Sequence, residues 1–263
     1  MYRSNPVCLW IVAVCVVGVV GCTPKLPPEA VATLRAGRTA YEDGDDRATI
    51  QRMDAFLAAH GTSERAGEAH YYRGLARYRL KKYDAARADL QAALDETDDE
   101  RTHLAAQVAL ADLAYDLGRL DEAQRRYAEA LEATEPGRPP DGHVRYRLGC
   151  VLQRRGKWND AALQFRRVMH YDPDGELARR SERRAPCRAW TVQAGAFREQ
   201  GNAAEAAAAL SARGLSATVQ PELDEDRLLF LVIVGRHGTY EVARRTLPTV
   251  RKHRADAFVT TTR

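Results

Sequence analysis

The sequence lacks the short motifs that mark many hydrolases and nucleotide-binding enzymes. It contains no GxSxG turn for a nucleophilic serine, no GxxxxGK[ST] phosphate loop and no HExxH zinc pair. Its seven histidines are scattered, and none stands at ligand spacing from another histidine or from a cysteine. These absences argue against an enzyme, and they predict a chain that works without a metal or cofactor.

The sequence also lacks a strong charge of one sign. Forty lysines and arginines face 36 aspartates and glutamates, and the net charge is only +4. The charges are interspersed along the chain. Many proteins that bind nucleic acid instead have their basic residues gathered into one block. The composition therefore predicts no nucleic-acid partner.

Cysteine is scarce, and most of it lies at the start of the chain. Of five cysteines, Cys8, Cys15 and Cys22 fall within the first 22 residues. The other two, Cys150 and Cys187, can form one disulfide in an oxidising compartment or remain two separate thiols. Their long separation in sequence leaves both alternatives open.

The N-terminus reads as an export signal. Arg3 precedes an apolar run from Val7 to Gly21, which is short for a membrane-spanning helix and ends in small residues. The run closes with Val19-Val20-Gly21-Cys22, which resembles the lipobox of bacterial lipoproteins. The resemblance implies removal of residues 1–21 and diacylation of Cys22. The alternative is an uncleaved anchor with an incidental cysteine.

The residues that follow fit an anchored protein. Residues 22–29 are rich in proline and predict an extended tether. The residue after the cysteine is Thr23 rather than aspartate, which the lipoprotein resemblance associates with the outer membrane more than the inner one. We therefore expect a lipid-anchored protein of the cell envelope that faces the periplasm.

Residues 30–184 contain four related segments, each with small residues, a turn and a second helix-like run. The first segment, 30–60, is the weakest match. Equivalent small positions recur at spacings of 37, 37 and 38 residues, namely Thr49, Ala86, Ala123 and Ala161. A period in this range predicts stacked helical repeats, because a single repeat cannot bury its own apolar face.

These segments resemble tetratricopeptide repeats. The fullest match is the fourth, through Leu148, Gly149, Gly156, Trp158, Ala161, Phe165 and Pro173. The resemblance implies an α-solenoid with a concave groove that binds a protein partner, and a polar helix at 175–184 that caps it. Tyrosines on the first helices are the candidate groove residues, although packing between repeats is the alternative for each: Tyr71, Tyr78, Tyr115 and Tyr146.

A different pattern begins after the repeats. Residues 190–194 alternate as in a strand, and "GAF" at 195–197 is expected to end it. Asn202 is a plausible cap for an alanine-rich helix, and Pro248 is expected to interrupt a second helix. The predicted order is β-α-β-β-α-β, so the whole chain is predicted to be mainly α, with a solenoid followed by a small α+β domain at 187–263.

This module resembles a SPOR domain. The carrying residues are "WTVQAGAF" at 190–197, "LFLVIVG" at 229–235 and "ADAFV" at 255–259, and the resemblance spans residues 188–262. It implies binding of peptidoglycan, particularly glycan strands stripped of stem peptides, on the sheet face that the helices leave uncovered.

Five residues are candidates for that glycan-binding face. Gln193 is favoured because an amide both donates and accepts hydrogen bonds, as sugar hydroxyls require. The others are Thr191, Ala196, Leu231 and Ile233. For the two aliphatic residues, packing against the repeats or another subunit is an equal alternative.

Three functions follow from these patterns. The first is a lipid-anchored envelope protein that holds glycan through one module and recruits a protein through the other, in cell division or envelope organisation. The second is a periplasmic adaptor for envelope assembly whose C-terminal module contacts protein. The third, RNA binding, is disfavoured because "LLFLVIV" lacks the basic and aromatic residues of RNA-binding strands.

Overall fold

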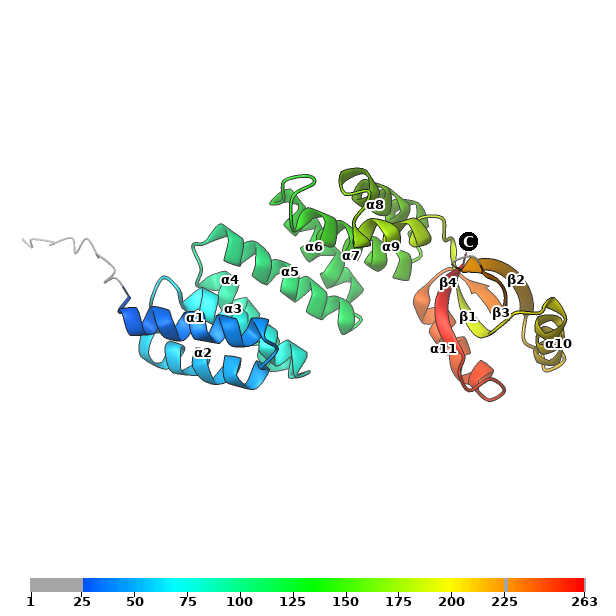
Figure 1. Ribbon diagram of the computed structural model, residues 1–263, viewed down its shortest axis with the longest axis horizontal. Helices are drawn as coiled ribbons and strands as arrows, with labels where there is room; N and C mark the ends of the chain where they lie inside the picture. Colours follow the sequence, from blue (N-terminus) through cyan, green and yellow to red (C-terminus); the bar gives the residue numbers. More distant parts are fainter. Residues whose placement is uncertain (1–25, 225–226, 263) are drawn as a thin grey trace, which may run out of the picture.

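The computed structural model describes residues 26–224 and 227–262. The predicted lipobox, Cys22 and the first residues of the tether lie outside them. A solenoid of helices leads into a small domain built on a four-stranded sheet (Figure 1). The predicted fold class is confirmed.

Four antiparallel helix pairs and a ninth helix make up the described solenoid. Each pair packs on the next, so the apolar side of every repeat is covered by its neighbour. The helices are α1 (Pro28–Glu42), α2 (Asp46–His60), α3 (Ala66–Arg79), α4 (Tyr83–Asp95), α5 (Glu100–Asp116), α6 (Leu120–Glu132), α7 (Asp141–Arg154), α8 (Trp158–Tyr171) and α9 (Glu176–Arg184).

Small residues allow the two helices of a repeat to approach closely. A Cβ added at Gly74 would lie 2.9 Å from Leu90 Cγ, and one at Gly149 would lie 2.6 Å from Phe165 Cε1. The four recurring positions identified in the sequence, Thr49, Ala86, Ala123 and Ala161, are fully buried. The repeat period is therefore set by helix crossings that accept no bulky side chain.

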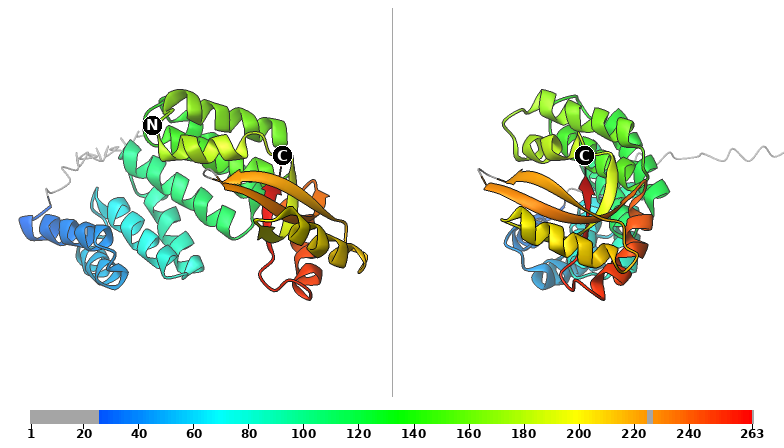
Figure 2. Two further views of the ribbon diagram at one scale, coloured as in Figure 1. Left: turned by 45° about the vertical axis from the view of Figure 1, so that its right-hand side comes forward. Right: turned by 90° about the vertical axis from the view of Figure 1, so that its right-hand side faces the viewer.

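The C-terminal sheet has the strand order β2-β3-β1-β4, and all neighbouring strands are antiparallel. Helices α10 and α11 cover one face, where alanines of α10 and Val250 of α11 pack on Val192, Val232 and Val234 (Figures 1 and 2). The elements are β1 (Ala189–Phe197), α10 (Gln200–Ser211), β2 (Ala217–Asp224), β3 (Arg227–His237), α11 (Tyr240–Arg251) and β4 (Phe258–Thr262).

Three local expectations were wrong. Strand β1 continues through residues 195–197, because a bulge after Gln193 absorbs the irregularity and Phe197 still pairs with Phe230. Helix α10 already begins at Gln200, and Asn202 instead donates a hydrogen bond to the Glu199 carboxylate at 3.2 Å. Pro248 lies within α11 without ending it.

Two further features bear on the sequence analysis. Cys150 and Cys187 are both buried free thiols, so the disulfide alternative is not realised in this structure. Within residues 26–224 and 227–262, no helix is both long and apolar enough to cross a bilayer.

Candidate functional site

The strand register defines the sheet face opposite α10 and α11, which we call the open face. Gln193 in β1 pairs with Ile233 of β3 on one side and with Phe258 of β4 on the other. Since directly paired residues point to the same side, these three side chains share the open face. Two of the predicted residues, Ala196 and Leu231, form the next pair along the same face.

Two of the five predicted glycan residues are not accessible. Thr191 is fully buried, and its hydroxyl donates to the carbonyls of Gly235 at 2.7 Å and Val234 at 3.2 Å. These hydrogen bonds supply donors to backbone carbonyls at the β3 bulge, where Gly235 has φ +69°. Ile233 is only 5% exposed. Gln193 and Leu231 are half-buried and Ala196 is exposed, so these three remain available to a ligand.

The burial of Ile233 follows from the curl of the sheet. Thr262 on edge strand β4 donates a 2.6 Å hydrogen bond to Oε1 of Gln220 on the other edge strand, β2. The two edge strands therefore meet over the open face, as the twist of a small sheet permits. The centre of this face is enclosed, and the accessible part lies around Gln193, Ala196 and Leu231.

Phe258 is an open-face residue that the sequence analysis did not select. It pairs with Gln193 and is 48% exposed, which is unusual for an aromatic side chain in a small domain. The alternation in "FVTTT" contained the signal, because Phe258, Thr260 and Thr262 stand two residues apart and so share one face. An exposed ring beside an amide suits a sugar, which offers apolar C–H surfaces and hydroxyls together.

The four candidate tyrosines of the solenoid do not form one stripe. Tyr78 donates a hydrogen bond to Asp116, whose carboxylate also lies 3.5 Å from Arg147, and this guanidinium stacks 4.4 Å from the Tyr115 ring. These contacts bring Tyr78 and Tyr115 together. Burial is the main cause that raises the pKa of the Tyr78 phenol, and the hydrogen bond to Asp116 raises it further. The phenol therefore stays a neutral donor.

The other two tyrosines lie apart from this pair. Tyr71 packs edge-on against Tyr72 at 5.2 Å and joins the apolar cluster around Leu90. Tyr146 contacts Phe165 at 5.7 Å and lines a hollow between the solenoid and the C-terminal domain. The cluster that Tyr78 and Tyr115 share is therefore centred on α3, α5 and α7 near Asp112, Asp116 and Arg147.

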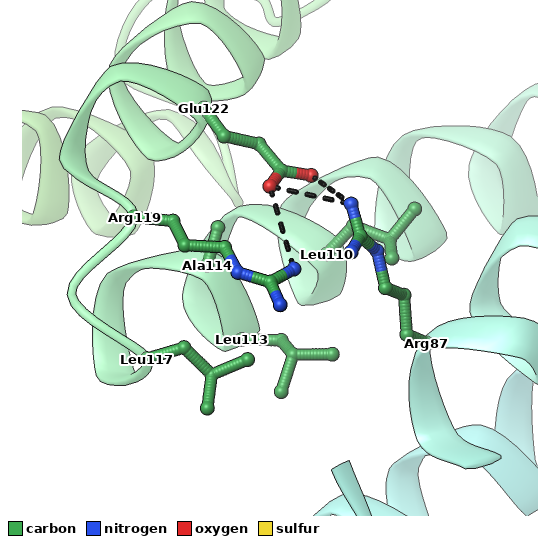
Figure 3. Close-up of a pocket in the computed structure, with 7 residues that line it drawn as sticks. All are labelled: Arg87, Leu110, Leu113, Ala114, Leu117, Arg119 and Glu122. Carbon is green, nitrogen blue, oxygen red and sulfur yellow. Dashed lines mark hydrogen bonds and ion pairs between the residues drawn. The ribbon is translucent and has the colours of Figure 1, made fainter. Parts of the chain in front are cut away.

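A small hollow between α4, α5 and α6 is structural. Its polar groups are already paired, because Glu122 binds Arg87 at 3.1 Å and Arg119 at 3.9 Å (Figure 3). These ion pairs lie beside the apolar side chains that line the rest of the hollow, Leu110, Leu113, Ala114 and Leu117. The arrangement joins neighbouring repeats and leaves no polar group free for a ligand.

Trp190, the first residue of the "WTVQAGAF" stretch, fastens the sheet to the solenoid. Its indole nitrogen donates to the Gln153 carbonyl at 2.8 Å, and its ring packs 6.1 Å from Trp158 and 5.1 Å from Tyr240. Arg154 adds a stack on Tyr240 and a 3.2 Å ion pair with Glu241. The C-terminal domain is thus docked on α7 and α8.

Comparisons with protein families agree with this architecture. Residues 188–261 match the SPOR domain, and residues 34–101 and 101–170 match two tetratricopeptide-repeat families. The chain therefore consists of tetratricopeptide repeats followed by a C-terminal SPOR domain, as the sequence resemblances predicted. Both are binding modules. No curated protein is significantly similar to the chain.

Solved structures share the helical-repeat part. A structure of the APC/C hetero-tetramer Cut9-Hcn1 is 16% identical with a TM-score of 0.53, over 60% of this chain and 30% of that one. A MamA structure is 21% identical with a TM-score of 0.48, over 55% and 78%. The 41-end form of MamA from Desulfovibrio magneticus RS-1 is 14% identical with a TM-score of 0.48, over 57% and 78%. The likeness to Cut9-Hcn1 shows a shared fold alone.

Proposed function

We propose that this chain is a lipid-anchored protein of the cell envelope that binds peptidoglycan glycan through its SPOR domain and recruits a protein through its repeats. The first half of the proposal rests on the open face. The second half rests on the cluster of aromatic and charged side chains around Tyr78 and Arg147. No step requires turnover, since both activities are reversible binding.

The observation that carries the glycan assignment is the pairing of Gln193 with Phe258. The amide can exchange hydrogen bonds with hydroxyl and acetamido groups, while the exposed ring offers an apolar platform to a sugar face. Ala196 and Leu231, one exposed and one half-buried, extend this surface along the strands. A linear glycan held there would contact residues of β4, β1 and β3.

The surface that we propose for protein binding, the cluster around Tyr78 and Arg147, combines charge of both signs with aromatic side chains. Asp112 binds Arg147 at 2.6 Å and His143 at 3.4 Å, and Asp116 binds Tyr78. Such a surface suits a peptide that offers polar groups to paired charges and an apolar side chain to Tyr115. We propose that a protein partner binds this surface.

The place of the protein in the cell is part of the proposal. Exported lipoproteins carry the acyl chains on the cysteine that ends the lipobox, which here is Cys22. Anchoring of Cys22, most consistently in the outer membrane because Thr23 follows it, would place the SPOR domain beside the cell wall. A role in division or envelope organisation follows from binding stripped glycan.

Sedimentation with purified sacculi tests the glycan assignment. The full chain, kept in detergent, is expected to sediment with amidase-treated sacculi, and Gln193→Ala or Phe258→Ala is expected to weaken binding about tenfold each, as lost contacts in a ligand site typically do. Both side chains are partly exposed, so the fold should tolerate their truncation.

Matched controls lie on the helix-covered side of the domain. Gln200→Ala removes an exposed amide from α10, and Val242→Ala removes an apolar side chain that is 45% exposed on α11. Both should bind as the unaltered chain does. If the unaltered chain fails to sediment with treated and untreated sacculi alike, the glycan function is wrong and the open face is better explained as a protein interface.

A further inference from the structure

A polar hollow lies at the junction between the solenoid and the open face. It measures about 610 Å³ and is bounded by α7, α9, β2 and β4. Figure 2 shows α9 beside the curled β2–β3 hairpin, on the side of the sheet away from α10. The lining residues are Tyr146, Arg180, Arg183, Arg184, Cys187, Gln220, Pro221, Glu222, Leu223, Thr260, Thr261 and Thr262.

The hollow is continuous with the glycan-binding part of the open face. Thr260 and Thr262 follow Phe258 at alternate positions of β4, so their side chains point to the same side. Gln220 occupies the same face of β2, because it pairs with Leu231. A chain lying on Gln193 and Phe258 and continuing along β4 would therefore reach α9.

Helix α9 contributes most of the charge in this hollow. Three arginines and one glutamate line it, which leaves a net positive charge. Arg184 is already engaged, because it donates to Gln153 Oε1 at 3.0 Å while Gln153 donates back to its carbonyl at 2.9 Å. This reciprocal pair fixes the last turn of α9 against α7.

The two other arginines are available to a ligand. Arg180 is half exposed, and its guanidinium forms a 2.6 Å ion pair with the Glu176 carboxylate, whose side chain is 67% exposed. Exposed pairs of this kind are weak, so a ligand can replace the partner. The Arg183 side chain is exposed and makes no hydrogen bond or ion pair with residues 26–224 or 227–262. A guanidinium in a hollow with no protein partner fits a site for an anionic ligand.

Stripped glycan carries the matching anion. In intact peptidoglycan the lactyl group of each muramic acid is joined to the stem peptide by an amide bond. An amidase hydrolyses that bond, the water oxygen goes to the lactyl carbonyl, and the peptide leaves with a free amino group. Each stripped muramic acid therefore keeps a carboxylate, whereas an intact one presents a neutral amide.

We propose that Arg183, assisted by Arg180, binds the lactyl carboxylates of glycan held on the open face, so that a solenoid helix outside the SPOR domain supplies the preference for stripped strands. The inference rests on the proposed glycan function. It assigns discrimination to α9 and general sugar contact to Gln193 and Phe258.

The test combines an arginine substitution with a change to the carboxylate. The full chain, Arg183→Ala and Arg180→Ala/Arg183→Ala are titrated against amidase-treated sacculi, and against the same sacculi after carbodiimide coupling to ammonia converts the lactyl carboxylates to amides. We expect Arg183→Ala to bind treated sacculi about fivefold more weakly, as befits one charge-assisted contact near the surface, and the double variant to lose more. Amidation of the sacculi should weaken binding by the unaltered chain to a similar extent, but it should not change binding by the double variant.

Arg179→Ala is the matched control. It removes an arginine from the same helix whose side chain bonds the Asp174 carbonyl at 2.7 Å and does not line the hollow. It should bind as tightly as the unaltered chain, and thermal melts should show that each variant is folded.

The outcomes separate the two proposals. One outcome is that Arg183→Ala and the double variant bind treated sacculi as tightly as the unaltered chain does. Another is that amidation weakens binding by both variants as much as it weakens binding by the unaltered chain. Either outcome would show that the role of α9 is wrong while the glycan function stands. If the unaltered chain binds neither preparation, the glycan function fails, and the role of α9 fails with it.

Discussion

At the scale of single residues, one backbone position recurs in the turn of every repeat. Gly44, Gly118 and Gly156 have φ between +75° and +82°, and the equivalent residue of the second repeat is Lys81 at φ +59°. Lys81 is the one non-glycine residue with positive φ in the described part of the chain. A Cβ is unfavourable in this left-handed conformation, whereas glycine accepts it freely.

Lys81→Gly should therefore stabilise the solenoid. Relief of the left-handed strain outweighs the greater freedom of glycine in the unfolded chain, so we expect a gain of about 0.5–1 kcal/mol in the free energy of unfolding. Urea denaturation measures it. Lys81→Ala is the control, because it removes the exposed side chain but keeps the Cβ. Equal stability of the two variants would show that the backbone is not strained.

At the scale of elements, a buried carboxylate joins three helices. Asp89 of α4 has a side chain only 4% exposed, and it accepts hydrogen bonds from Arg73 at 2.6 Å and Arg77 at 2.8 Å, both on α3. Arg73 also bonds Asp54 of α2 at 2.7 Å. Burial alone would raise the pKa of Asp89, but hydrogen bonds from His70 and Arg73 and the nearby guanidinium charges lower it below its ordinary value of 3.8.

This lowered pKa predicts acid sensitivity. A carboxyl whose pKa is lower in the folded state than in the unfolded state stabilises the fold at pH values above the unfolded-state pKa. That stability is lost as the pH falls towards and through the folded-state pKa. The free energy of unfolding should therefore decline below about pH 4, where the unfolded carboxyl takes up its proton. In Asp89→Asn this decline should be shallower, because the titrating group is gone.

The same substitution should also be costly at neutral pH. It leaves Arg73 and Arg77 partly buried without their shared charge, and breaking such a pair costs about 3 kcal/mol. Asp54→Asn, which alters a half-exposed partner of the same Arg73, should cost much less. Urea titrations at several pH values measure both effects. An equal loss for Asp89→Asn at every pH would contradict the linkage.

At the scale of the whole molecule, the two modules form a continuous structure rather than beads on a linker. The turn of the last repeat contacts the C-terminal domain directly, since a Cβ on Gly156 would lie 2.6 Å from the Gly238 carbonyl oxygen. Trp158 adds a hydrogen bond from its indole nitrogen to the same carbonyl at 3.2 Å. The docked arrangement is what brings the arginines of α9 to the open face.

Gly156→Ala should loosen this junction. Gly118→Ala is the control, because Gly118 and Gly156 have nearly the same φ and an alanine should be equally strained by the left-handed backbone at either position. A Cβ at Gly118, however, would meet nothing closer than 3.9 Å. We expect Gly118→Ala to cost about 1 kcal/mol, and Gly156→Ala to cost roughly 1–2 kcal/mol more because of the added clash. Calorimetry should also separate the unfolding of the two modules only in Gly156→Ala. Identical melts of the two variants would exclude a tight junction.

Local patterns in the sequence determined the repeats, their period near 37 residues, and the order of strands and helices in the C-terminal domain. These follow from apolar periodicity and from small residues at helix crossings, which act over a few turns of chain. The sequence also singled out Gln193, because an amide both donates and accepts hydrogen bonds and alternation places it opposite Val192 and Ala194. It did not select Phe258, although the alternation of β4 carried the same information.

Tertiary structure decided which of those residues a ligand can reach. Thr191 and Ile233 have the right parity for the open face, yet the curl that joins Gln220 to Thr262 buries Ile233, and the β3 bulge engages Thr191. The docking of Trp190 on the solenoid, and with it the place of Arg183 beside the sheet, depends on contacts between residues more than 30 positions apart. Periodicity specifies the faces of an element, whereas only the packed molecule specifies what covers them.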